Sequence, residues 1–369
     1  MSSSLLPAPG RRLVLAFALG AGLLSGCAGG KAEQRPDVVW PLPPEKARVK
    51  FLRAFAREDD LNAGGFQTAL RVVIPASPDA VIQQPTGLAL SPDGRFLYVT
   101  CASVGRVIRV DLRESKLEVV SIDEGKQPAS PFDVAVDGQG NLYISDMVNH
   151  AVWAYTPAGK FLLKIPVGDK PTGVAVDPRR QLLYVVVGVT QKTDHRVEVF
   201  SLKGQKLRTM GTRGIGPGQF NFPTHLAVGR DGNLYVVDML NFRVQVFDPE
   251  GQLVTMFGMP GAGEPGTFDK AKGVALDGFG NVYVTDSQQG TVQIFNPAYQ
   301  PLLTFAGRAT LPGYLLVPGA IAIDARNTIY VADFAGGSVN EYQLINTTAE
   351  DSFLAPPEGK AEAGGPTTK

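Results

Sequence analysis

Three histidines and one aspartate are the side chains of this sequence best suited to metal or acid–base chemistry. His150, His195 and His225 could each ligate a transition metal, because imidazole is the side chain most often used for that purpose. Asp133 could add a carboxylate ligand or act as a general base. Whether these residues can act together depends on the elements that carry them.

The sequence contains none of the common local signatures of catalysis. It has no G-x-S-x-G, no H-E-x-x-H and no phosphate-binding loop that ends in Lys-Ser or Lys-Thr. With two cysteines it offers no C-x-x-C-H haem motif and no paired zinc ligands. Cys101 lies in an apolar segment, and we expect it to be a small buried side chain.

The composition indicates a folded, turn-rich protein that does not bind nucleic acid. Lys+Arg and Asp+Glu each number 35, so the chain lacks the basic excess needed to neutralise phosphates. Hydrophobic residues make up 44% of the chain, which argues against wholesale disorder. The 42 glycines and 28 prolines favour short elements joined by turns.

Six repeated segments make up most of the chain and carry the candidate residues. Each opens with an apolar run in which an alanine recurs at intervals of 40 to 52 residues: Ala89, Ala135, Ala175, Ala227, Ala275 and Ala322. Eight or nine residues later a tyrosine recurs: Tyr98, Tyr143, Tyr184, Tyr235, Tyr283 and Tyr330. A third apolar strand follows in every segment, and a fourth follows in five of them. Four short strands in a repeat of roughly 40 to 50 residues are typical of a β-propeller.

The two recurring residues have physical roles in such a fold. Inner strands converge on the axis of a propeller, where alanine lets neighbouring blades approach closely. The tyrosine rings would fill the wider space between blades, and each hydroxyl would need a partner. We therefore predict an all-β fold, a six-bladed β-propeller.

An N-terminal segment supplies the strand that the last repeat lacks. The sixth segment stops after its third strand, at residues 338–345, whereas residues 48–56 resemble the fourth strands of the other segments. We infer that residues 48–56 complete the last blade and close the ring, which removes exposed sheet edges. The propeller would then span residues 49–346, and a disordered, polar tail would follow at residues 347–369.

The repeats resemble NHL repeats, most fully in residues 223–228 (PTHLAV), 232–238 (GNLYVVD) and 241–247 (NFRVQVF). The resemblance covers about residues 38–346 and implies an NHL/TolB-like propeller. In such propellers the blade-to-blade connections and the loops between second and third strands form one binding rim. The resemblance places these binding candidates on that rim: Phe132, Asp133, His150, His195, His225, Phe242 and Lys272.

The same resemblance argues against a metal site. His150 and His195 occupy a position where NHL repeats often carry histidine, so His225 alone departs from the pattern. Peptide-amidating lyases of this fold bind zinc through histidines just after the blade-opening proline, where this chain has none. We expect no metal or other cofactor apart from a covalent lipid, and identify no catalytic residue. Should a metal bind, His225 and Asp133 are its candidate ligands.

Four aspartates end the second strand of their repeats: Asp146, Asp238, Asp286 and Asp333. They could form a carboxylate ring for cations or acid–base work. They could equally accept hydrogen bonds from the following loop or from an arginine, as Asp238 could from Arg243. We favour the structural role, because NHL repeats carry this aspartate irrespective of function.

The first 26 residues have the features of a bacterial lipoprotein signal peptide. Arg11 and Arg12 precede a 12-residue apolar stretch, which is too short to span a bilayer. Leu24-Ser25-Gly26-Cys27 resembles the lipoprotein processing motif, which implies cleavage before Cys27 and acylation of that residue. Residues 27–48 would be a lipidated tether. Because Ala28 follows the cysteine, we expect the outer membrane of the bacterial envelope, facing the periplasm.

We therefore expect a membrane-anchored, non-catalytic scaffold that presents its rim to a protein or peptide of the cell envelope. One alternative is a metal-assisted lyase or lactonase with its site at the channel mouth. Another is an accessory subunit of a periplasmic electron-transfer complex, although the sequence offers no haem or iron–sulfur ligand set.

Overall fold

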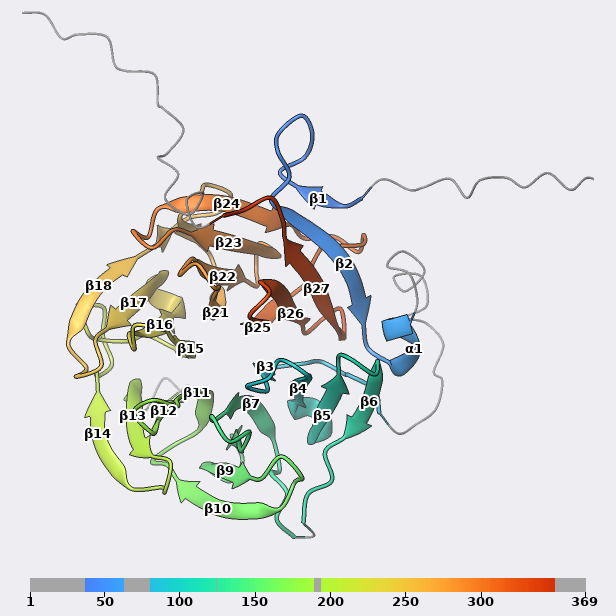
Figure 1. Ribbon diagram of the computed structural model, residues 1–369. Coiled ribbons are helices and arrows are strands. Elements are labelled where there is room, and N and C mark those ends of the chain that lie inside the picture. The colour runs from blue at the N-terminus through green and yellow to red at the C-terminus, as the bar shows by residue number, and fades with distance from the viewer. Residues whose placement is uncertain (1–36, 63–79, 124, 189–193, 349–369) are drawn as a thin grey trace, which may run out of the picture. The chain divides into compact units, whose positions relative to one another are not determined.

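The computed structural model describes residues 37–62, 80–123, 125–188 and 194–348. Within them, six antiparallel sheets stand around a common axis (Figure 1). The predicted all-β, six-bladed propeller is thereby confirmed. The expected signal peptide, Cys27 and residues 349–369 of the expected tail lie outside the described residues.

The first three blades each contain four strands, ordered from the axis outward as they follow in the chain. Blade 1 contains β3 (Gly87–Leu90), β4 (Phe96–Cys101), β5 (Arg106–Asp111) and β6 (Lys116–Val119). Blade 2 contains β7 (Pro131–Val136), β8 (Leu142–Asp146), β9 (Ala151–Tyr155) and β10 (Phe161–Pro166). Blade 3 contains β11 (Pro171–Asp177), β12 (Leu182–Val187), β13 (Arg196–Ser201) and β14 (Lys206–Met210).

Blades 4 and 5 repeat this arrangement, and blade 6 draws strands from both ends of the propeller. Blade 4 contains β15 (Pro223–Val228), β16 (Leu234–Asp238), β17 (Arg243–Phe247) and β18 (Leu253–Phe257). Blade 5 contains β21 (Ala271–Leu276), β22 (Val282–Asp286), β23 (Thr291–Phe295) and β24 (Pro301–Ala306). Blade 6 contains β25 (Pro318–Ile323), β26 (Thr328–Asp333), β27 (Ser338–Leu344), β2 (Val49–Phe55) and β1 (Val39–Trp40).

The remaining described elements are short. A two-residue parallel pair, β19 (Met259–Pro260) and β20 (Thr267–Phe268), lies between blades 4 and 5 in the chain. The helices are α1 (Glu58–Asn62), η2 (Ala102–Val104) and η3 (Met239–Asn241). None of the described helices is long and apolar enough to cross a membrane.

The N-terminal strand closes the ring as predicted. β2 pairs antiparallel with β27, so that Val49 lies opposite Leu344 and Phe55 opposite Val339. Segments nearly 300 residues apart in the chain, such as Ala54 and Asn340, are thereby joined in one sheet (Figure 1). This pairing leaves no gap between the last blade and the first, and covers a sheet edge that would otherwise be exposed.

Residues 37–48 belong to the propeller, which corrects the expected tether at its C-terminal end. β1 pairs with the outer edge of β2 and adds a fifth strand to blade 6. Trp40 is 7% exposed, and its ring centroid lies 6.0 Å from those of both Phe305 and Tyr342. The proline-rich composition suggested an extended linker, but the buried indole fixes this segment to the blade.

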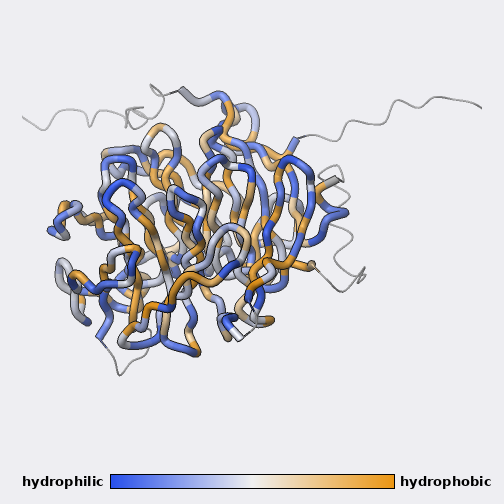
Figure 2. Tube along the Cα trace, turned by 60° about the horizontal axis from the view of Figure 1, so that its bottom comes forward, coloured by the Kyte–Doolittle hydropathy of each residue, from blue (hydrophilic) through white to orange (hydrophobic). Residues whose placement is uncertain are grey.

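The packing between blades follows the predicted pattern. All six recurring tyrosines are at most 4% exposed, and two of their hydroxyls donate to buried aspartates, Tyr143 to Asp137 and Tyr283 to Asp277. Burial of each ring contributes about 1.5–3 kcal/mol. Figure 2 shows hydrophobic residues within the body of the ring and hydrophilic residues in turns at its surface. Cys101 is fully buried as predicted, and burial raises the pKa of its thiol to about 11.

Candidate functional site

A ring of hydrogen bonds joins neighbouring blades where the inner strands converge. The acceptors are backbone carbonyls at one repeated position, just after the blade-opening proline. The donors are Thr100 Oγ1 to Phe132 O (2.7 Å), Ser145 Oγ to Thr172 O (2.6 Å), Thr172 Oγ1 to Thr224 O (3.2 Å), Thr224 Oγ1 to Lys272 O (2.7 Å) and Thr285 Oγ1 to Gly319 O (2.7 Å). We call these five contacts the axial hydroxyl ring. Sequence reasoning missed it, although hydroxyl residues recur at the positions concerned.

His225 lies at the same end of the axis and is 6% exposed. Its Nδ1 lies 3.1 Å from Lys272 O in the next blade, and its Nε2 lies 3.1 Å from Thr86 O at the start of blade 1. Carbonyl oxygens accept hydrogen bonds and cannot donate them, so both contacts are hydrogen bonds when each ring nitrogen carries a hydrogen. Whichever ring nitrogen carries a hydrogen donates to the carbonyl oxygen that it faces.

Asp133 approaches the axis from blade 2 and is 4% exposed. Its Oδ2 accepts a hydrogen bond from Val174 N at 3.0 Å. Burial raises the pKa of this carboxyl group, and the nearby positive charge of His225 partly opposes the shift.

Four of the seven rim candidates therefore come together: Phe132, Asp133, His225 and Lys272. The ring of Phe132 lies 6.0 Å from that of His225. Lys272 is half-buried, and burial lowers the pKa of its ammonium group. At this end of the axis, Oδ2 of Asp133 and both ring nitrogens of His225 contact backbone groups.

The other three candidates lie in the loops between second and third strands. His150 is exposed, and its carbonyl accepts from Val167 N at 3.0 Å. His195 is fully buried, and its Nδ1 accepts from the backbone N–H of Phe222 at 3.1 Å. Phe242 contacts the Lys270 ammonium, which lies 5.5 Å from the centroid of its ring. These three residues hold loops and are not part of the group at the axis.

The recurring aspartates have the structural role favoured from the sequence. Asp146 accepts from the backbone N–H groups of Ala129, Ser130, Val148 and Asn149, and from Trp153 Nε1. Asp238 Oδ2 lies 2.9 Å from Arg243 Nε in a buried ion pair, as predicted. Across the four described ranges, no three His, Cys, Asp or Glu side chains are grouped so that they could hold a metal ion.

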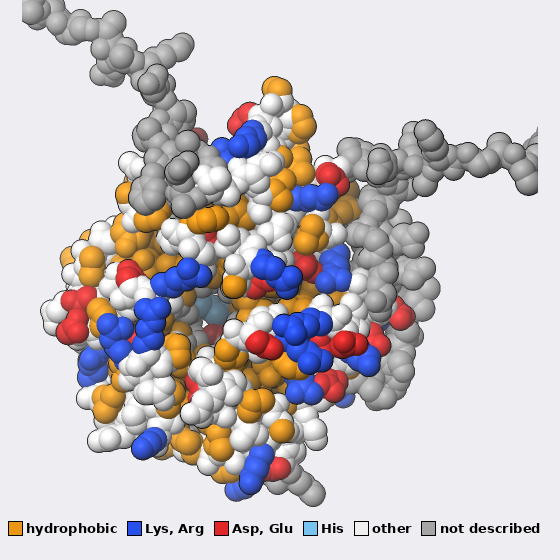
Figure 3. Space-filling view, in the orientation of Figure 1, with side chains coloured by type: hydrophobic (Ala, Val, Ile, Leu, Met, Phe, Trp, Pro, Cys, Tyr) orange, Lys and Arg blue, Asp and Glu red, His pale blue; other side chains and the backbone are white. Residues whose placement is uncertain are grey.

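The central channel contains a cavity of about 790 Å³. Aliphatic side chains of all six inner strands form its wall, and the turns after those strands, including Arg230 and Phe279, form its mouth. Figure 3 shows an opening at the centre of the ring, with a histidine side chain inside it. Because His225 spans the axis at the opposite ends of these strands, the channel is closed there.

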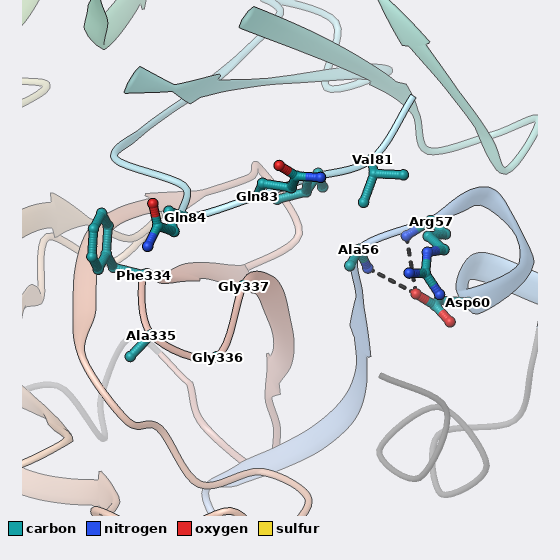
Figure 4. Close-up of a pocket in the computed structure, with 11 residues that line it drawn as sticks. Ala56, Arg57, Asp60, Val81, Gln83, Gln84, Phe334, Ala335, Gly336 and Gly337 are labelled. Carbon is teal, nitrogen blue, oxygen red and sulfur yellow. Dashed lines mark hydrogen bonds between the residues drawn. The ribbon is translucent and has the colours of Figure 1, made fainter. Parts of the chain in front are cut away.

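A second cavity, of about 360 Å³, lies where blade 6 meets blade 1. We call it the rim pocket, and its lining residues are Ala56, Arg57, Asp60, Val81, Ile82, Gln83, Gln84, Phe334, Ala335, Gly336 and Gly337 (Figure 4). Its walls are a blade-to-blade connection and the β26–β27 loop, the two kinds of segment expected to form the binding rim. The sequence marked these loops but did not identify the residues that line the pocket.

Comparison with known proteins agrees with this architecture. Residues 76–189 match the family model of the SMP-30/gluconolactonase/LRE-like region. Antigen Lp49 of Leptospira interrogans is 28% identical over 183 residues, and NHL repeat-containing protein 2 of Bos taurus is 28% identical over 187 residues. The chain is a six-bladed β-propeller that is similar to SGL and NHL-repeat proteins over part of its length.

The likeness to these relatives is partial. The matches cover 45% and 47% of this propeller chain, but 39% of Antigen Lp49 and 22% of the bovine protein. An auxiliary nutrient binding protein from Bacteroides thetaiotaomicron has a TM-score of 0.57 at 14% identity, covering 71% of this chain and 69% of that one. Similarity at this level establishes the shared fold and leaves the activity of the propeller open.

Backbones approach one another closely at the axis, so we predict that a side chain at Gly173 lowers the stability of the fold. A Cβ on Gly173 would lie 2.5 Å from Thr224 O and 2.8 Å from His225 Cα. We expect Gly173→Ala to lower the free energy of unfolding by about 1–3 kcal/mol, measured by denaturant titration. Gly138→Ala is the matched control, because its Cβ would meet Pro178 Cβ at an ordinary 3.6 Å. Equal stability of the two variants would contradict this packing.

Proposed function

We propose that this propeller is a lipid-anchored, non-catalytic binding module of the bacterial cell envelope. Its rim pocket would hold a short segment of a partner protein. The observation that carries the proposal is a contrast between two sets of polar groups. The hydrogen-bonding atoms of His225 and Oδ2 of Asp133 are engaged with backbone at the axis, whereas Gln83 and Gln84 at the rim pocket are exposed. A site that binds a partner needs accessible groups, and the rim pocket offers them.

The rim pocket has the chemistry to bind a peptide. Phe334 is 38% exposed and offers an aromatic face to an apolar side chain. Gln83 and Gln84 are exposed, and their amides can donate to and accept from a peptide backbone (Figure 4). The volume of 360 Å³ lies within the range of ligand pockets, roughly 300–1,000 Å³.

The frame of the pocket is fixed from within the chain. Asp60 Oδ2 accepts from the backbone N–H groups of Ala56 and Arg57, at 2.9 and 3.0 Å (Figure 4). Asp333, which precedes Phe334, accepts from Leu316 N and Val317 N, both at 2.8 Å. A preformed pocket loses less conformational entropy on binding than a flexible one. The name of the Bacteroides nutrient binding protein is consistent with a binding role for this fold.

The two alternatives read from the sequence are not favoured. A metal-assisted lyase or lactonase would use His225 and Asp133, but the nitrogens of His225 and Oδ2 of Asp133 already have backbone partners. An electron-transfer subunit would need groups that hold or contact a redox centre, and nothing in the described residues points to such a group.

The lipid anchor predicts a specific acylation site. A chain expressed in its native type of host should incorporate an alkyne-labelled fatty acid, and Cys27→Ser should abolish the label and release the protein from membranes. Cys101→Ser is the matched control, because Cys101 is buried in the propeller. This substitution should leave labelling unchanged. Label that persists in Cys27→Ser would contradict the proposed anchor.

The binding role predicts a contact at Phe334. A photo-crosslinking residue in place of Phe334 should couple to one envelope protein in intact cells, and mass spectrometry should define the coupled segment. A synthetic peptide of that segment should bind the full chain, and Phe334→Ala should weaken binding at least tenfold, because exposed aromatic anchors dominate such interfaces. Isothermal titration calorimetry measures the change.

Val148 provides the control position for crosslinking. It lies in the corresponding loop of blade 2 and is 64% exposed, but it does not line the rim pocket. If Phe334 and Val148 coupled to the same proteins with equal yield, or if the peptide bound Phe334→Ala as tightly as the original chain, the rim pocket would not be the binding site.

A further inference from the structure

The joint between blade 6 and blade 1 differs from the other five joints at the axis. Thr100, Ser145 and Thr285 donate across their joints from one repeated position, just before the last residue of the second strand. Thr172 and Thr224 serve the next two joints from the inner strands. Blade 6 has Ala332 at the repeated position, and this side chain cannot donate.

His225 takes the place of the missing hydroxyl. The carbonyl left without a hydroxyl donor is that of Thr86, which lies 3.1 Å from His225 Nε2. His225 belongs to β15 in blade 4, so this contact crosses the axis instead of joining neighbouring blades. Thr86 O, at the joint that β2 and β27 close outside, therefore faces an imidazole of blade 4 in place of a hydroxyl of blade 6.

The same joint contains the rim pocket. Gln83 and Gln84 line the pocket and precede Thr86 by three and two residues. Ile82 N donates to Ala56 O at 2.8 Å and fixes one end of this short segment, while Thr86 N donates to Thr100 O at 2.9 Å. The contact from His225 to Thr86 O thus anchors the other end of the wall that carries the two glutamines.

We propose that His225 is a positioning residue for the rim pocket. Its imidazole holds the 81–86 connection in place from across the axis through the contact with Thr86 O. The proposal rests on the proposed function for its biological meaning, since it describes how one wall of the binding pocket is positioned. The physical coupling between His225 and the pocket wall can be tested without any partner.

Hydrogen exchange of the full chain tests this coupling. In His225→Ala, the amides of Ile82 and Thr86 should exchange at least tenfold faster, as resolved by mass spectrometry of peptides that cover residues 80–88. Ala332→Ser restores a hydroxyl at the position of Ser145, so His225→Ala/Ala332→Ser should return to within about twofold of the original rate.

The controls separate this proposal from general destabilisation. His150→Ala removes an exposed histidine and should leave the 80–88 peptides unchanged. If His225→Ala does not fold, His225→Leu, which keeps side-chain volume but has no donor, allows the same comparison. Unchanged exchange at residues 80–88, equal acceleration at all six joints, or failure of Ala332→Ser to restore protection would each overturn the proposal. If the exchange results support the contact between His225 and Thr86 but Phe334 does not crosslink to a partner, the proposed function alone would be contradicted.

Discussion

Backbone carbonyls that face one another around the axis are the constraint on which this propeller depends. Six inner strands converge there, and each brings a carbonyl that neighbouring strands of its own blade do not satisfy. A buried carbonyl without a donor costs about 1–3 kcal/mol. Five hydroxyl groups and one imidazole supply the donors, and each joins elements of different blades. These bonds set how closely the blades approach at the axis.

This constraint separates the groups that hold the fold from those free to bind. In the sequence, Asp133 and His225 are candidates for a small catalytic group. In the structure, Oδ2 of Asp133 and both ring nitrogens of His225 contact backbone groups at the axis. The recurring aspartates likewise hold the connections that lead into their own blades. Recognition then falls to side chains outside these networks, and Phe334 with the two glutamines lies at the joint where both ends of the propeller meet. The joint that closes the ring therefore also forms the walls of the rim pocket.

The fold could be predicted from the sequence because its determinants are local and repeated. The alanine and tyrosine positions, the six segments and the displaced strand at 48–56 all follow from spacing and alternation, and the structure confirms them. The role of Trp40 could not be predicted, because the two residues of β1, Val39 and Trp40, are too few to show the alternating hydrophobic pattern of a strand. His225 was noticed as an exception to the repeat, but its reach to Thr86 depends on the three-dimensional position of blade 4 relative to blade 1. The rim pocket likewise joins segments that are some 250 residues apart in the chain.

His225 is the sixth donor of the axial ring through its Nε2, which lies 3.1 Å from Thr86 O. Two-bond ¹H–¹⁵N NMR of the chain labelled with ¹⁵N-histidine shows which ring nitrogen carries a hydrogen, and three histidines give a spectrum simple enough to assign with a His225→Gln variant. We predict that Nε2 of His225 carries a hydrogen at neutral pH. A bare Nε2 at the same pH would contradict this contact.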